Sequence, residues 1–240
     1  MKRTTNRAWR VVGGGMGAAA LLGIGHLATT WYRYGRAVKR AGPPTLLDRF
    51  VPEYEVCERH ETQVDAPVEW TYAAARGMDL MQSPIIRAIF RGRELLMGAI
   101  PTKPRAPQPL VDEVLAIGWG MLAEETGREL VLGAVTQPWE AEVKFRSLPP
   151  DEFAAFDAPG FAKIAWVIRA DPLGPAASRF STETRVTTTD AEARRRFRRY
   201  WTMVSPGVRL IRRESLRLVR SEAEWRYRAD QDSTDEGVTA

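Results

Sequence analysis

The amino-acid sequence predicts an α+β domain in which an antiparallel sheet is followed by one long helix. Three observations predict this class. Residues 54–64 alternate between two sets of side chains, as a half-buried strand does. Two pairs of apolar runs, in residues 118–135 and 161–188, each enclose a short turn, which is typical of β-hairpins. Apolar residues then recur at three- and four-residue spacings after Asp190, which indicates an amphipathic helix.

Length and composition suit one substantial folded domain with appendages. The chain has 240 residues, of which 44% are hydrophobic and 27% charged, as in an ordinary globular protein. The single cysteine, Cys57, excludes an internal disulfide framework and a zinc site built on cysteines. The net charge of +5 is unevenly spread, with basic residues crowded in the first 40 positions and in 194–228. Such a distribution favours an anionic partner, either nucleic acid or lipid heads.

A glycine-rich stretch near the N-terminus allows two interpretations. Gly13–Ala18 fits the phosphate-loop pattern G-x-G-x-x-A, but the first acidic residue of the chain is Asp48, too late to bind a ribose. Residues 11–31 are instead 21 uncharged positions, about the length of a membrane-spanning helix. We therefore expect a single-pass anchor within a basic region, residues 1–32. The alternative is a cleaved signal peptide, and the balance of flanking basic residues leaves the side of the membrane open.

The segments after the predicted anchor begin with a linker. Residues 33–52 are basic and contain prolines, which indicates a juxtamembrane linker. After the strand of residues 54–64, we expect a helix with Asp65 as its N-cap and Pro67 as its first residue. A short helix over Pro84–Phe90 and a proline-rich loop over Pro101–Pro109 follow.

The second half of the chain contains the hairpins and the long helix. A further strand within residues 141–148 and a helical turn over Asp151–Phe156 are expected between the hairpins. Asp190 should cap the long helix, which Pro206 should interrupt before it resumes to about Glu224. The acidic tail, residues 225–240, is predicted to be disordered. The folded domain is therefore predicted to span residues 53–224.

Two stretches carry a resemblance to a known superfamily. "ERHETQVDAPVEWTY", residues 58–72, is similar to the opening strand and helix start of START-like, Bet v 1-type (SRPBCC, polyketide cyclase-like) proteins. "RFSTETRVTTTDAEARRRFRRYW", residues 179–201, resembles their last strand and C-terminal helix. The resemblance covers residues 53–224 and implies a helix-grip fold, a curved antiparallel sheet wrapped around the long helix with a cavity between them. Because members include lipid carriers, receptors and cyclases, it implies no single activity.

The implied cavity and the apolar pattern together select candidate ligand-binding residues. Nine come from the sheet segments and two from the helix: Trp119, Met121, Leu130, Leu132, Phe145, Ile164, Trp166, Ile168, Phe180, Phe197 and Trp201. The alternative is that they fill a solid core, because cores and pockets use the same side chains.

His60 and Glu183 are the polar candidates for chemistry. His60 shares a strand face with Thr62 and Val64, from which it could act as an acid or base near neutral pH, or serve only a structural role. Glu183 shares a face with Arg185. If that face pointed inward, the pair could bind a ligand head group together with Arg169 on the neighbouring strand. We expect the outward placement, because the alternate positions 180–186 suit an interior better.

The densest charge of the chain is the arginine-rich run of residues 194–220. It favours contact with anionic lipid heads over nucleic acid, since no nucleic-acid-binding motif accompanies it; the alternative is a solvated helix face. The chain has neither a G-x-S-x-G elbow nor an H-E-x-x-H motif, and two histidines with one cysteine supply too few ligands for a typical transition-metal site, so we expect no metal and no cofactor.

The sequence therefore predicts a membrane-anchored START-like domain that binds a lipid or another hydrophobic small molecule without catalysis of its own. One alternative is a polyketide cyclase/aromatase-like enzyme that uses polar cavity residues. The other is a scaffold that docks a partner through the arginine-rich helix.

Overall fold

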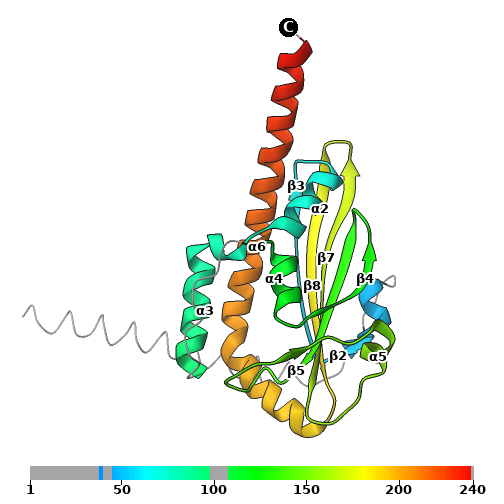
Figure 1. The fold of residues 1–240 in the computed structure, drawn as a ribbon, viewed down its shortest axis with the longest axis vertical. Helices are drawn as coiled ribbons and strands as arrows, with labels where there is room; N and C mark the ends of the chain where they lie inside the picture. The colour runs from blue at the N-terminus through cyan, green and yellow to red at the C-terminus, as the bar shows by residue number, and fades with distance from the viewer. Residues whose placement is uncertain (1–37, 40–44, 98–107, 239–240) are drawn as a thin grey trace, which may run out of the picture.

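The computed structural model describes residues 38–39, 45–97 and 108–238, and a six-stranded antiparallel sheet lies at its centre (Figure 1). Five strands follow the order β3 (Val56–Val64), β8 (Ala177–Thr188), β7 (Ala162–Gly174), β5 (Glu129–Thr136) and β4 (Gly120–Glu125), and β6 (Phe145–Arg146) pairs with β5. A separate two-stranded pair joins β1 (Val38–Lys39) to β2 (Glu53–Tyr54). The predicted first strand and both predicted hairpins, β4–β5 and β7–β8, are confirmed.

Short helices fill the connections. They are η1 (Leu46–Arg49), α2 (Val68–Gly77), η2 (Leu80–Gln82), α3 (Pro84–Met97), α4 (Leu110–Ala116) and α5 (Pro150–Ala155). The expected Asp65 cap is wrong: α2 begins at Val68 with Pro67 as its N-cap, and the Asp65 amide donates instead to Glu224 Oε1, at 3.1 Å. α3 runs seven residues beyond the predicted end, and α4 follows a predicted loop that lies largely outside the described residues.

The long helix α6 (Ala191–Val238) begins as predicted. Asp190 Oδ1 accepts hydrogen bonds from the amides of Glu192, at 2.7 Å, and Ala193, at 2.8 Å. Pro206 bends α6 rather than ending it (Figure 1), because the sheet holds both halves: Trp201 packs before the bend and Val219 after it. The tail expected to be disordered instead continues the helix. An Arg226–Glu222 ion pair of 2.8 Å and the contact of Tyr227 with the Trp70 ring favour this.

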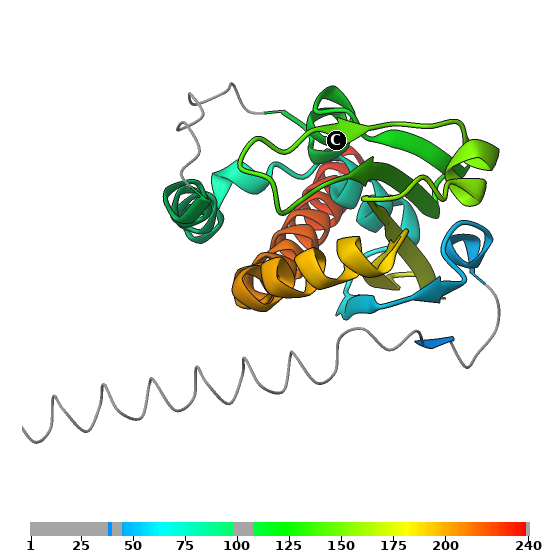
Figure 2. The same ribbon diagram turned by 90° about the horizontal axis from the view of Figure 1, so that it is seen from below.

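The two faces of the sheet pack against different segments (Figure 2). The face toward α2 and α6, here called the grip face, carries Leu132, Trp166 and Phe180. On the outer face, Val131 and Val167 pack against η1 and α5. The molecule is thus an α+β domain whose curved antiparallel sheet grips a long C-terminal helix, as predicted.

Part of the predicted linker belongs to the folded unit. Leu47, Phe50 and Val51 are at most 3% exposed and pack on the outer face, so the ordered domain includes residues 45–52. The predicted anchor, residues 11–31, lies outside the described residues. Within the part of the chain that the structure describes, no helix combines the length and apolarity needed to cross a bilayer.

Candidate functional site

The sequence-predicted lining residues lie in or beside the sheet, but in separate groups. Leu130, Leu132, Trp166, Ile168 and Phe180 pack together with Val219 and Ala223 of α6. Phe197 and Trp201 form a second cluster with Val56 and Val186, and Ile164 packs against it. Trp119 and Phe145 contact each other, with ring centroids 5.6 Å apart, and Met121 is 40% exposed. In this state the apolar side chains mainly fill a core.

Two surface hollows lie away from those residues. They measure about 230 and 270 Å³, and both include Gln137, which follows β5. Their linings mix charged side chains, such as Glu140 and Arg196, with apolar ones, such as Phe161 and Trp139. Both hollows are smaller than the roughly 300–1,000 Å³ of ordinary ligand pockets.

A polar cluster lies between the apolar groups on the grip face. Strand β3 supplies Glu58 and His60, which pair directly with Thr184 and Thr182 of β8. Helix α6 supplies Arg209 and Arg212, one turn apart. We call these six residues the grip cluster. Sheet pairing and helical spacing therefore bring together side chains that are far apart in the chain, such as Glu58 and Arg209, which are separated by 151 positions.

The acidic member of the grip cluster is already paired. Glu58 Oε1 lies 3.3 Å from Arg209 Nε, and Glu58 Oε2 lies 3.5 Å from His60 Nε2. His60 Nε2 is buried and makes no hydrogen bond within the described residues. His60 thus lies on the face of the sheet toward α6, where a ligand held between sheet and helix could contact it. Its nearest charged neighbour, Glu58, also forms an ion pair with Arg209.

Arg212 is held differently. Its guanidinium donates to Thr182 Oγ1, at 3.2 Å, and to Thr184 Oγ1, and lies 5.4 Å from the centre of the Trp166 ring. Trp166 Nε1 also donates to Thr182 Oγ1, at 2.7 Å, which fixes that hydroxyl. No carboxylate forms an ion pair with Arg212 within the described part of the chain.

Electrostatics make this arrangement unusual. Burial lowers the pKa of Arg212 to about 10, and the charge of Glu58 opposes part of that shift. The guanidinium therefore stays charged at neutral pH. Two arginines face one glutamate, so the grip cluster keeps one positive charge when His60 is neutral. A desolvated cation without a counter-ion is costly, and an anionic group beside it would offset that cost.

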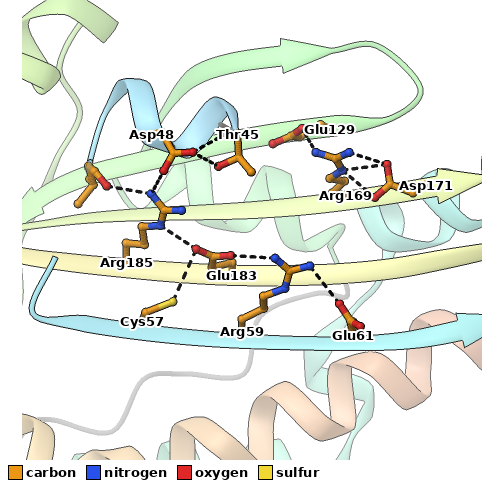
Figure 3. A network of polar contacts seen from close by, with 11 residues as sticks. Thr45, Asp48, Cys57, Arg59, Glu61, Glu129, Arg169, Asp171, Glu183 and Arg185 are labelled. Carbon is orange, nitrogen blue, oxygen red and sulfur yellow. Dashed lines mark hydrogen bonds and ion pairs between the residues drawn. The ribbon is translucent and has the colours of Figure 1, made fainter. Parts of the chain in front are cut away.

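Glu183 lies on the opposite face of the sheet, in a balanced network (Figure 3). Arg185 is fully buried and donates to Asp48 Oδ1, at 2.6 Å, to Glu183 Oε1, at 2.7 Å, and to the Val51 carbonyl, at 3.0 Å. Burial alone would raise the pKa of Asp48, but the Thr45 amide and Arg185 outweigh it and leave that pKa lowered. Glu183 therefore helps to hold the segment before β2 on the sheet, and it lies on the wrong face to contact a ligand on the grip face.

The neighbouring charged side chains of the outer face also form ion pairs within the protein. Arg59 Nη1 lies 3.7 Å from Glu183 Oε2, and Arg169 bonds Glu129 and Asp171. Burial, followed by the charge of Glu183, raises the pKa of the Cys57 thiol to about 12. Such a thiol is a poor nucleophile at neutral pH.

Sequence reasoning missed Glu58, Arg209 and Arg212 as site residues. A usable signal existed for Arg212, because it lies on the same helical stripe as Trp201, Val208 and Val219, the buried side of α6. The same spacing also fits Arg194, seven residues before Trp201, so the signal narrows the arginine-rich run to these two residues.

Most other arginines of that run form ion pairs within the chain. Arg194 binds Glu55, at 2.7 Å, and Arg195 and Arg196 both bind Glu192. Further along, Arg217 binds Glu214, at 2.7 Å, and Arg220 binds Glu224, at 2.8 Å. Much of the positive charge seen in the sequence is therefore neutralised locally.

Together, the fold and the grip cluster define a helix-grip domain with an uncompensated cation between its sheet and its helix. No family model matches the chain, and no curated protein matches it either.

Among solved structures, the chain is similar to a conserved protein from Geobacillus kaustophilus, with 10% identity over 70% of this chain and 95% of the other, and a TM-score of 0.30. It is also similar to the Zhui aromatase/cyclase from Streptomyces sp. R1128, with 16% identity over 71% and 94% of the chains and a TM-score of 0.26. A third is CalU16 from Micromonospora echinospora, with 14% identity over 81% and 98% of the chains and a TM-score of 0.26.

Proposed function

We propose that this domain binds a hydrophobic small molecule with an anionic group between its sheet and α6, and that Arg212 binds that group. The observation that carries the proposal is a charged guanidinium, partly buried between the sheet and α6, with hydroxyl and aromatic partners but no carboxylate ion pair in the described structure. A carboxylate or phosphate would supply the missing negative charge. Its oxygens would accept hydrogen bonds from the N–H groups of the guanidinium that the threonines do not use.

The apolar part of such a ligand has suitable neighbours on both sides of Arg212. The cluster of Val219 and Ala223 lies toward one end of α6, and that of Phe197 and Trp201 toward the other. Because these side chains now pack against the sheet, ligand entry requires them to separate. The transfer of the ligand tail from water, at roughly 25 cal/mol per Å², would drive that change.

The domain acts in this proposal as a carrier or sensor without chemistry of its own. The predicted anchor in residues 11–31 would hold it at a membrane, where amphiphilic anions are concentrated. A free fatty acid and a phospholipid share the required chemistry, an anionic head on a long apolar tail.

A specific observation favours a second function. His60 Nε2 lies 3.5 Å from Glu58 and on the same face as Arg212. In a cyclase-like enzyme, Arg212 could stabilise an enolate oxygen while His60 moves the proton. The test is whether the wild type chemically alters a bound ketone-bearing molecule that the His60→Gln variant binds but leaves unchanged. That result would replace the carrier function with the enzymatic one.

The carrier proposal is tested with two probes that share one apolar tail and differ only in the head group, an anionic carboxylate against a neutral hydroxyl. The full chain is stripped of bound lipid and titrated with sodium oleate and with oleyl alcohol, and native mass spectrometry counts the bound molecules. We expect oleate to bind about tenfold to a hundredfold more tightly, since a charge-assisted hydrogen bond contributes about 1.5–3 kcal/mol.

The Arg212→Gln variant should lose this preference. Arg195→Gln is the matched control, because Arg195 is an exposed arginine of the same helix that binds Glu192. Equal affinity of the wild type for acid and alcohol, or an unchanged preference in Arg212→Gln, would refute the role given to Arg212.

A further inference from the structure

The side of α6 that faces away from the sheet carries exposed apolar residues. Met203 is 52% exposed and Leu210 is 48% exposed, and the seven-residue interval places both on one side of the helix, across the bend at Pro206. The same stripe continues to exposed Arg199 on one end and exposed Arg213 on the other. Arg212 lies on the opposite side, so this stripe is separate from the grip cluster.

The charges of this stripe are not neutralised. Arg199 and Arg213 have no carboxylate partner among the described residues, in contrast to Arg194, Arg195 and Arg217. Residues 193–213 contain no aspartate or glutamate. The positive charge therefore remains available where the exposed apolar residues lie.

Helix α3 extends this surface. It lies beside α6 at the edge of the molecule in both views (Figures 1 and 2), tied by a Ser83–Glu214 hydrogen bond of 3.0 Å. The two helices approach each other closely at Gly207 of α6, where an added Cβ atom would lie 3.0 Å from Ile89 Cγ2 of α3. α3 adds exposed apolar residues on both flanks of its buried side, Ile85, 50% exposed, on one flank and Phe90, 39% exposed, on the other, and residues 84–92 contain no acidic residue.

We propose that α3 and the outward side of α6 form a surface that docks on an anionic lipid bilayer. We call it the α3/α6 surface, defined by Arg199, Met203, Leu210 and Arg213 of α6 together with the flank of α3 beside them. The apolar tips would enter the interfacial region while the arginines contact lipid phosphates, the division of roles found in interfacial amphipathic helices. A second copy of this chain fits less well, because a symmetric interface would set these arginines against their equivalents. The proposal does not depend on the ligand proposed for Arg212.

A fluorescent label on the full chain tests this directly. In a Cys57→Ser background, a solvatochromic maleimide is attached at Leu210→Cys, or at Leu173→Cys as the matched control. Leu173 is also an exposed apolar residue, 45% exposed, but lies near the β7–β8 turn. Both proteins keep residues 1–37, so a predicted anchor acts equally in each. Each is reconstituted with vesicles of phosphatidylcholine, with or without phosphatidylglycerol.

We expect a blue shift of the label at position 210 with phosphatidylglycerol vesicles and none at position 173. Adding salt should reverse it, and Arg199→Gln and Arg213→Gln should each reduce the docked-to-undocked ratio about fivefold. Four results would overturn the proposal: no shift at position 210, an equal shift at position 173, an equal shift with phosphatidylcholine alone, or a shift that rises with protein concentration without vesicles. The last result would assign the surface to a second copy of the chain.

Discussion

Arg185 and Arg212 lie on opposite faces of one sheet, Arg185 fully buried and Arg212 partly buried, and their surroundings differ in charge. Arg185 contacts two carboxylates, Asp48 and Glu183, and a main-chain carbonyl. Arg212 contacts two threonine hydroxyls and an indole ring. A buried charge that the protein itself balances serves the fold, whereas one that the protein leaves unbalanced is free to recognise a ligand. The comparison thus separates an arginine that holds the fold together from one to which we assign ligand binding as a proposal.

The largest effect is expected from the balanced site. Arg185→Met removes the cation between two carboxylates and leaves Asp48 and Glu183 without their main partner. Breaking a buried ion pair from one side costs about 3–5 kcal/mol, and we expect that loss in the free energy of unfolding, measured by urea denaturation.

Arg169→Met is the matched control on the same outer face. The Arg169 side chain is 27% exposed and also pairs with two acidic residues, Glu129 and Asp171. Asp171 is 28% exposed and keeps Arg128 as a partner, so only Glu129, 3% exposed, loses its ion pair while buried, and the loss should be smaller, about 1–3 kcal/mol. If Arg185→Met and Arg169→Met lower the free energy of unfolding by the same amount, the deeper burial of Arg185 does not make its ion pairs more important to stability than those of Arg169.

An intermediate effect is expected from Asp48, the carboxylate that joins the segment before β2 to Arg185. Its lowered pKa in the folded state means that folding favours the charged form, so its contribution is present above its unfolded pKa of about 3.9 and is lost as pH falls through the lower folded value. Asp48→Asn should cost about 1–2 kcal/mol at neutral pH. Urea denaturation from pH 7 to pH 3 should show wild type and variant converging below about pH 4.

Asp232→Asn, at an exposed position of α6, controls for general effects of acid. A gap between wild type and Asp48→Asn that stays constant with pH would show that the carboxylate charge is not what holds this segment on the sheet.

The fold was largely predictable because its signals are local. The alternation in residues 54–64 and the Glu125–Arg128 turn, with Gly127 at a φ of +78°, specify strands and hairpins from near neighbours alone. The errors occurred where distant contacts decide. Leu47 and Phe50 look like linker residues until the sheet packs against them, and Tyr227 looks like part of a disordered tail until it meets Trp70.

The site was only half predictable for the same reason. His60 could be placed on the correct face from strand alternation, and the outward placement of Glu183 could be expected from its neighbours. Arg212 was hidden in a run of arginines that look alike in sequence. What distinguishes it is the combination of a place on the sheet-facing side of α6 with the absence of a carboxylate partner in the described structure, and only the packing of the helix on the sheet reveals that combination.

The smallest stability change is expected at the unbalanced site. Arg212→Met removes a desolvated cation and puts an apolar side chain of similar length on the buried stripe of α6. The lost hydrogen bonds to Thr182 and Thr184 and the relieved desolvation oppose each other, so the free energy of unfolding should change by less than about 1 kcal/mol, in either direction. The protein must be stripped of lipid first, because a bound ligand stabilises the wild type alone. The same Arg→Met change would then cost several-fold more at Arg185 than at Arg212. If it costs as much at Arg212, a partner within the protein already balances that charge, and an anionic ligand is no longer needed to explain it.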